Sequence, residues 1–406
     1  RVWWKNHKFR AKDTFTYNVP SEPDYATLDP DAQTMDIDYR NNFTGKMTKE
    51  TMFYRPGMRY LPRNRYVIQY HPTLHYLDKD GYLPGFRYKS SYGMLDYFES
   101  DLNVSLETKK TFYKISGWTR TPLKSIDQIN YHMFDLQGVR GSGLSFIKEI
   151  DRNNSINGLK RISFGFYQNQ VKDTFRTHLY DDGALIVTST KIHSIFAKIK
   201  NNISIDFTPF KASDWSFSRI VFTNSFDERL GFFGARFRQI YGQIWSNENG
   251  APLQERFNVE GAGSGDLYEK SYLRDNTSFY DNKEFFGRYH LPGDANLRAF
   301  GNQGFSGVEQ VFAITFEGFL SKSFAGVNIE LAGFIDQGTL SGSKFAVGDK
   351  GFNNSTLVDY GIGLRISTAI FGQPIYLRFD KPLDAKIDGK SIEEMNDWVF
   401  SFQKSI

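Results

Sequence analysis

The 406-residue sequence contains no cysteine, and it has no run of eighteen apolar residues. The first absence excludes disulfide bonds, thiolate metal sites and cysteine nucleophiles. The second absence excludes a transmembrane helix. It does not exclude a transmembrane β-barrel, because the alternating strands of a barrel give only a weak hydropathy signal. The mean hydropathy of −0.49 is therefore compatible with such a barrel.

The sequence also lacks the short motifs of common enzymes. No His-Glu-x-x-His is present, and Ser142 lies in Gly-Ser-Gly rather than in a nucleophile elbow. His71 and His75 lie in a strand pattern, where four residues span roughly 13 Å, too far to share a metal ion. The net charge of +4 is small for this length and indicates no nucleic-acid partner. We therefore expect no catalytic residue, no metal site and no cofactor in this chain.

Aromatic residues and alternating strands are abundant. Phe, Trp and Tyr make up 17% of the chain, as expected if aromatic girdles lie at both membrane interfaces. The segments 327–336, 360–367 and 375–380 alternate apolar and polar residues with period two, so each strand has one apolar face. A soluble β-sandwich could show the same alternation. Alternation and composition together favour an all-β fold, a transmembrane antiparallel β-barrel.

The pattern predicts two parts. Residues 1–64 are rich in turn signals and are predicted to form a short amino-terminal β-rich remnant and linker. Residues 65–406 repeat strand, turn, strand, and the Asp80-Gly81 turn is a strong hairpin signal. At roughly 20 residues per strand and connection, this part predicts about 16 strands, with fourteen as the alternative. The segment 247–306 is predicted to be one long loop, and such a loop is usually functional.

Three charges, one near the end of that loop and two on the strands after it, suggest a site. Arg298 lies in Leu297-Arg298-Ala299-Phe300, and Glu317 and Asp336 fall on the polar faces of the next two strands. A buried arginine is costly unless carboxylates meet it, and two inward carboxylates can hold its guanidinium through charge-assisted hydrogen bonds. The alternative is that these are three unrelated charges, with Arg298 in solvent.

The order of these motifs resembles the bacterial surface antigen superfamily, most clearly over residues 286–406. The resemblance implies a sixteen-stranded outer-membrane barrel in which Arg298 bonds Glu317 and Asp336 and tethers the loop in the lumen. Leu297 and Phe300 match the loop motif, and Phe334 and Gly338 match the strand motif. Ala299 stands where the superfamily usually has glycine, which questions the tight backbone of the loop tip.

That superfamily includes barrel-assembly insertases and two-partner-secretion transporters. The resemblance therefore implies insertion or translocation of polypeptide across the bacterial outer membrane, with membrane lipid and envelope proteins or substrate polypeptides as partners. Residues 28–42 resemble the close of a β-rich domain in Bacteroidetes-type fusions of a zinc aminopeptidase to such a barrel. The alternative function is therefore an outer-membrane anchor for an upstream zinc metallopeptidase. The motifs count against a third reading, a plain diffusion porin.

Overall fold

The protein is described from a computed structural model. The structure describes residues 18, 20–21, 26–28, 48–54, 65–77, 80–93, 95–136, 138–150, 158–172, 180–209, 213–247, 250–259, 263–264, 268, 287–289, 294–300, 306–342, 355–370, 373–392 and 398–404. Most of the predicted amino-terminal part, 1–64, lies outside these residues, and the division at residue 65 stays a prediction.

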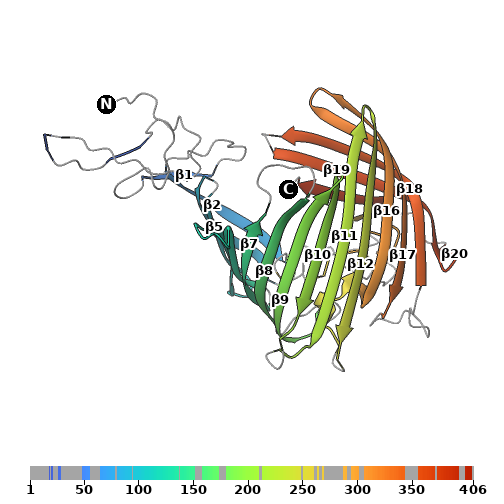
Figure 1. The fold of residues 1–406 in the computed structure, drawn as a ribbon, viewed down its shortest axis with the longest axis horizontal. Coiled ribbons are helices and arrows are strands. Elements are labelled where there is room, and N and C mark those ends of the chain that lie inside the picture. Colours follow the sequence, from blue (N-terminus) through green and yellow to red (C-terminus); the bar gives the residue numbers. More distant parts are fainter. Residues whose placement is uncertain are drawn as a thin grey trace.

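Long antiparallel strands form almost all of the described chain (Figure 1). Their bounds are β2 Tyr66–Leu77, β3 Gly81–Tyr92, β4 Asp96–Val104, β5 Thr111–Arg120, β6 Gln128–Leu136, β7 Val139–Glu149, β8 Gly158–Val171, β9 Gly183–Phe196, β10 Ile199–Phe207, β11 Phe217–Leu230, β12 Phe233–Ser246, β16 Gln310–Phe324, β17 Val327–Ser341, β18 Ser355–Ile370, β19 Gln373–Ile387 and β21 Trp398–Lys404.

Six short elements complete the described structure. They are β1 Lys49–Phe53, the 3-10 helix η2 Leu253–Glu255, β13 Phe257–Asn258, β14 Gly287–Tyr289, β15 Ser306–Val308 and β20 Lys390–Ser391. No helix among the described residues is long and apolar enough to cross a membrane.

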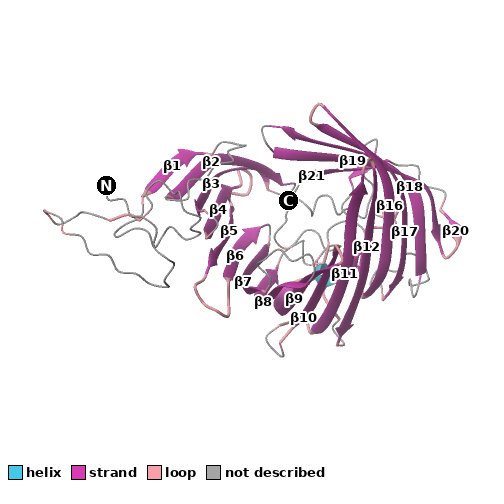
Figure 2. Ribbon diagram, turned by 45° about the horizontal axis from the view of Figure 1, so that its top comes forward, coloured by secondary structure: helices cyan, strands magenta, loops and turns pink. Residues whose placement is uncertain are grey.

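The long strands pair in chain order into one curved sheet (Figure 2). Strands β2 to β12 are neighbours in sequence order, β12 pairs with β16, and the order continues through β19 to β21. Within the described chain this run holds sixteen antiparallel strands, so the predicted all-β fold and strand number are confirmed. Each end of the run carries one short parallel strand, β1 on β2 and β14 on β21.

The strand connections divide the sheet into two ends. Tight hairpins join β9 to β10 at 197–198, β11 to β12 at 231–232, and β16 to β17 at 325–326. We call the end of the sheet at which these turns lie the turn end. Gly231 and Gly326 have positive φ in two of these turns, a conformation that glycine adopts without a steric penalty. The long connection from β12 to β16 begins at the opposite end of the strands, which we call the loop end.

The two faces of the sheet have opposite character. Phe316 is 47% exposed whereas its neighbour Glu317 is 1% exposed, and Ile335 is 47% exposed whereas Asp336 is fully buried. Because successive side chains of a strand point to opposite faces, the outer face is apolar and the charges point inward. A soluble β-sandwich packs its apolar face inward, so this sheet has the reverse arrangement that a membrane barrel requires.

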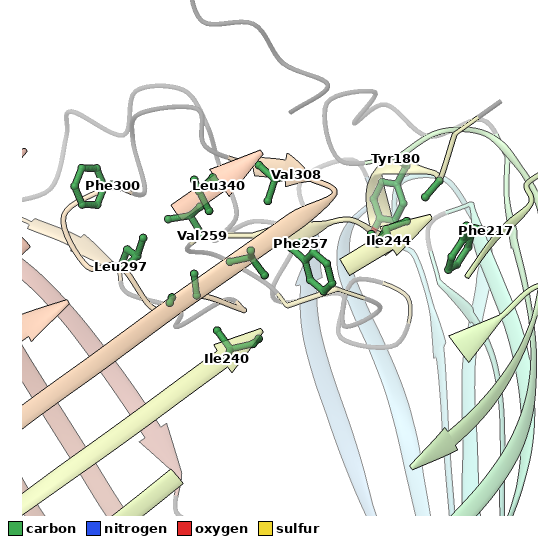
Figure 3. Packing of buried hydrophobic residues seen from close by; sticks show 14 of the residues in the cluster. Tyr180, Phe217, Ile240, Ile244, Phe257, Val259, Leu297, Phe300, Val308 and Leu340 are labelled. Carbon is green, nitrogen blue, oxygen red and sulfur yellow. The ribbon is translucent and has the colours of Figure 1, made fainter. Parts of the chain in front are cut away.

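The connection between β12 and β16 fills part of the interior at the loop end (Figure 3). Its residues Phe257, Val259, Leu297 and Phe300 are almost completely buried. They belong to one apolar cluster with wall residues such as Leu340 of β17. The connection is therefore packed as a second, inner layer against the wall.

Candidate functional site

The connection between β12 and β16 contacts the surrounding strands, which we call the wall, at two places that are far apart in sequence. We call 247–309, between β12 and β16, the lumen loop. Its described residues 250–259 and 294–300 are nearly all buried. Each of these two stretches carries one charged side chain that meets opposite charges on the wall, and the two contacts are described in turn.

Arg298 lies at the second contact and is only 1% exposed. Its Nε lies 3.2 Å from a carboxylate oxygen of Asp336, and its Nη2 donates to Glu317 at 3.4 Å. Its Nη1 lies 3.5 Å from Asp380. Glu317 lies on β16, Asp336 on β17 and Asp380 on β19. One guanidinium therefore contacts three strands of the wall. The structure thus brings the three sequence-predicted charges together and adds Asp380.

One of the other motif residues, Phe334, contacts this guanidinium directly. The ring of Phe334 lies under Arg298, with 3.8 Å between the guanidinium carbon and the ring centroid, a cation–π geometry. Leu297 and Phe300, which precede and follow Arg298 in the sequence, are fully buried. At Gly338 an added Cβ would lie 2.9 Å from a methyl group of Leu297, so a larger residue there would push against the Leu297 side chain.

Ala299 occupies its place without a strained backbone. Its φ is not positive, whereas Asn296 three residues earlier has φ of +58°. The backbone N–H of Ala299 donates to the buried carboxylate of Asp359 at 3.0 Å. The sharp turn of the loop tip is therefore made at Asn296, a residue type that tolerates this conformation, and alanine at 299 is no obstacle to it.

Three further arginines extend the charged wall toward the turn end. Arg236 of β12 contacts Glu317 at 2.9 Å and Glu330 at 2.7 Å. Arg365 of β18 also pairs with Glu317, and Arg378 of β19 pairs with Asp380. Glu317 therefore binds three guanidinium groups, counting Arg298, which compensates the cost of burying these charges.

At the first contact, in the stretch 250–259, the loop supplies the negative charge and the wall supplies the positive one. The sequence analysis did not predict this contact. Arg219 of β11 points inward, 2.9 Å from Asp206 of β10 and 3.0 Å from Glu255 of the lumen loop. Arg219 also donates to the backbone oxygen of Glu255 at 2.8 Å. Beside it the loop residue Gln254 exchanges hydrogen bonds with the backbone of Asp181. Here a loop carboxylate meets a wall arginine.

Two loop carboxylates have pKa values raised by their surroundings. Burial raises the pKa of Glu255, and Arg219 partly opposes this effect. Burial also raises the pKa of Asp294, and the backbone N–H groups of Asn258 and Ser264 that donate to it act in the opposite direction. Asp294 joins both stretches of the lumen loop, because Asn258 lies in the first and Asp294 in the second.

The histidines and the serine considered as candidate metal-binding or catalytic residues are not part of such a site among the described residues. In the part of the chain that the structure describes, no group of three or more His, Cys, Asp or Glu side chains is placed to hold a metal ion. His75 lies 3.5 Å from Asp101, an ion-pair distance if the imidazole is protonated. Ser142 is opposite Met133 and Gln168 in the sheet, in regular strand pairing.

Comparison with known proteins places the fold. No family profile and no curated protein matches this sequence. Among solved structures, the chain is similar to BamA from Haemophilus ducreyi lacking POTRA domains 1–3, with a TM-score of 0.50 at 13% identity over 83% of this chain and 70% of that one. The likeness shows that this chain shares the β-barrel fold of that structure.

A second solved structure, CdiB from Acinetobacter baumannii, gives a TM-score of 0.37 at 14% identity. That match covers 79% of this chain and 52% of CdiB, so this chain spans about half the length of that protein.

Proposed function

We propose that this chain forms an outer-membrane β-barrel that acts in the insertion or translocation of polypeptide, and that Arg298 tethers the lumen loop inside it. The observation that carries the proposal is the burial of Arg298 among Glu317, Asp336 and Asp380 of three wall strands. The apolar outer face supports placement in the outer membrane, because lipid is the solvent that such a face requires.

The tether follows from the energetics of a buried charge. Withdrawing Arg298 from the wall would leave three buried carboxylates with reduced compensation, and breaking a buried pair costs about 3–5 kcal/mol. The loop tip is therefore held in the lumen as long as these charges remain ionised. A polypeptide that passes the lumen must pass beside a loop fixed in this position.

Depletion of the protein in its native cell tests the proposed activity. If the barrel inserts or translocates polypeptide, depletion lowers the amount of other outer-membrane or secreted proteins, measured by quantitative proteomics of the membrane and medium. If the barrel only anchors an upstream metallopeptidase, those amounts stay constant and only the surface-bound peptidase is lost. No change in other envelope proteins would therefore contradict insertion.

Conductance in planar bilayers tests the tether separately. Releasing the loop by Arg298→Ala is expected to raise the single-channel conductance, because the loop then occupies less of the lumen. Arg229→Ala, which changes an exposed arginine on β11, is the matched control and is expected to leave conductance unchanged. Equal conductance of Arg298→Ala and the parent protein would contradict a tethered loop.

A further inference from the structure

A cavity of about 480 Å³ lies inside the sheet next to the second contact of the loop. Several of its wall residues, such as Lys200, Asp227 and Glu330, lie within a few positions of the tight turns, so the cavity lies between the lumen loop and the turn end. Its volume is within the range of small-ligand sites. Asn296 and Arg298 of the lumen loop form part of its lining.

The cavity lining has more cations than anions. Its cationic residues are Lys200, Arg236, Arg238, Arg298, Arg365 and Arg378. Its acidic residues are Asp227, Glu317 and Glu330. Asp336 and Asp380, which contribute to the same network, are fully buried and are not among the lining residues. The charges that face the cavity are therefore mostly positive.

Two of these cations differ from the others in their partners. Arg236, Arg298, Arg365 and Arg378 each form ion pairs with wall carboxylates. Among the described residues, no carboxylate forms an ion pair with Lys200 or Arg238, although the charges of Asp294 and Asp336 attract Arg238 at longer range. Arg238 donates instead to the backbone oxygen of Asp294 at 2.6 Å, which leaves most of its guanidinium donors for other partners.

The sheet register places these two cations on one row. Lys200 of β10 is opposite Ser225 of β11, and Ser225 is opposite Arg238 of β12. Because neighbouring strands are about 4.8 Å apart, the Cα atoms of Lys200 and Arg238 are about 10 Å apart, with the hydroxyl of Ser225 between them. All three side chains line the cavity.

We propose that Lys200, Ser225 and Arg238 form an anion-binding site that takes a phosphate group. Two long cationic side chains and a hydroxyl can converge on one tetrahedral oxyanion, and a doubly charged phosphate neutralises both cations at once. A guanidinium also matches the oxygen geometry of phosphate with two parallel hydrogen bonds. The proposal rests on the geometry of the lumen and does not depend on polypeptide insertion.

Titration calorimetry with inorganic phosphate, on the full chain in a phosphate-free detergent, tests the site. The parent protein is expected to bind one phosphate, and Lys200→Gln and Arg238→Gln are each expected to weaken binding roughly tenfold or more, since each loses one charge-assisted contact. Arg238→Lys keeps the charge and is expected to lose less than Arg238→Gln. Lys322→Gln, on the exposed side of β16 and outside the cavity, is the matched control and is expected to bind like the parent.

The same titration distinguishes the source of the phosphate. Protein in phospholipid discs is expected to show a weaker apparent affinity for added phosphate if a lipid headgroup occupies the site, and the same affinity as in detergent if free phosphate is the ligand. Either result supports the phosphate site. Absence of binding to the parent, or equal binding by the parent and the two glutamine variants, would overturn the proposal. Retained electrophoretic heat modifiability of each variant shows that it has folded.

Discussion

The two contacts of the lumen loop with the wall use opposite charges in different surroundings. At the first contact the loop supplies a carboxylate, Glu255, to Arg219, which also has Asp206 as a partner on the wall. At the second contact the loop supplies the cation Arg298, which is the shared partner of three wall carboxylates. Removing the loop charge therefore leaves the Arg219–Asp206 ion pair intact at the first contact. At the second contact it takes from Asp336 the guanidinium with which it pairs, while Glu317 and Asp380 keep arginines of the wall.

This difference predicts that the second contact fixes the loop more strongly than the first. Buried charges are tolerated only while they are compensated, so the cost of losing a partner depends on what remains. The predictions below compare the two contacts and run from the largest expected effect to the smallest.

Arg298→Ala is expected to have the largest effect. It leaves Asp336 and Asp380 without their loop partner inside the sheet, and we expect the free energy of unfolding to fall by about 3–5 kcal/mol. Urea unfolding in lipid vesicles, followed by tryptophan fluorescence, measures the change. A loss below that of the exposed control Arg229→Ala would show that the wall compensates its carboxylates without the loop.

Glu255→Gln is expected to cost less, about 1–2 kcal/mol, because Arg219 keeps Asp206 and the amide still accepts a hydrogen bond. Hydrogen exchange of the backbone at 250–259 is expected to speed up while exchange at 294–300 stays slow. Arg219→Ala, which leaves Asp206 and Glu255 without the guanidinium that they share, is the matched comparison and is expected to approach the effect of Arg298→Ala. Faster exchange of both loop stretches in Glu255→Gln would show that the two contacts act as one.

Phe334→Leu tests how much the aromatic ring beside Arg298 contributes to the second contact. It removes the ring under Arg298 and keeps an apolar side chain of similar size, so we expect a loss of about 1 kcal/mol in the free energy of unfolding. Phe319→Leu is the control, since Phe319 lies 3.9 Å from the more exposed Arg236 and its cation–π contact is worth less. Urea unfolding of both variants measures the difference, and a larger loss at Phe319 would contradict the role given to burial.

Much of the fold could be predicted from the sequence because alternation is a local property. The period-two pattern of 327–336 gives the facing of Ile335 and Asp336 directly, and the spacing of the turns gives the number of long strands. The short parallel strands β1 and β14 had no such signal, because their pairing with β2 and β21 involves segments of five and three residues. Periodicity needs more residues than these to be recognised.

The charged site could be predicted only in part, because some of its contacts depend on the curvature of the sheet and on the path of the loop. Glu317 and Asp336 lie on neighbouring strands, so their facing alone suggested that they share a partner. Asp380 ends the alternating segment 375–380, but β19 is two strands from β17, and only the curvature of the sheet brings its carboxylate to Arg298. Arg219 and Glu255 meet through the path of a loop without periodicity, which no local pattern specifies.

Ala299→Gly is the smallest effect and tests the loop tip itself. Because Ala299 has an ordinary backbone conformation, introducing glycine there removes no strain. Glycine instead adds freedom to the unfolded chain, so we expect a loss of about 0.5–1 kcal/mol in the free energy of unfolding. Arg298 should keep its three carboxylates, and exchange at 294–300 should stay slow. A gain in stability on the same urea scale would mean that alanine strains the tip, and would place the sharp turn at residue 299 instead of Asn296.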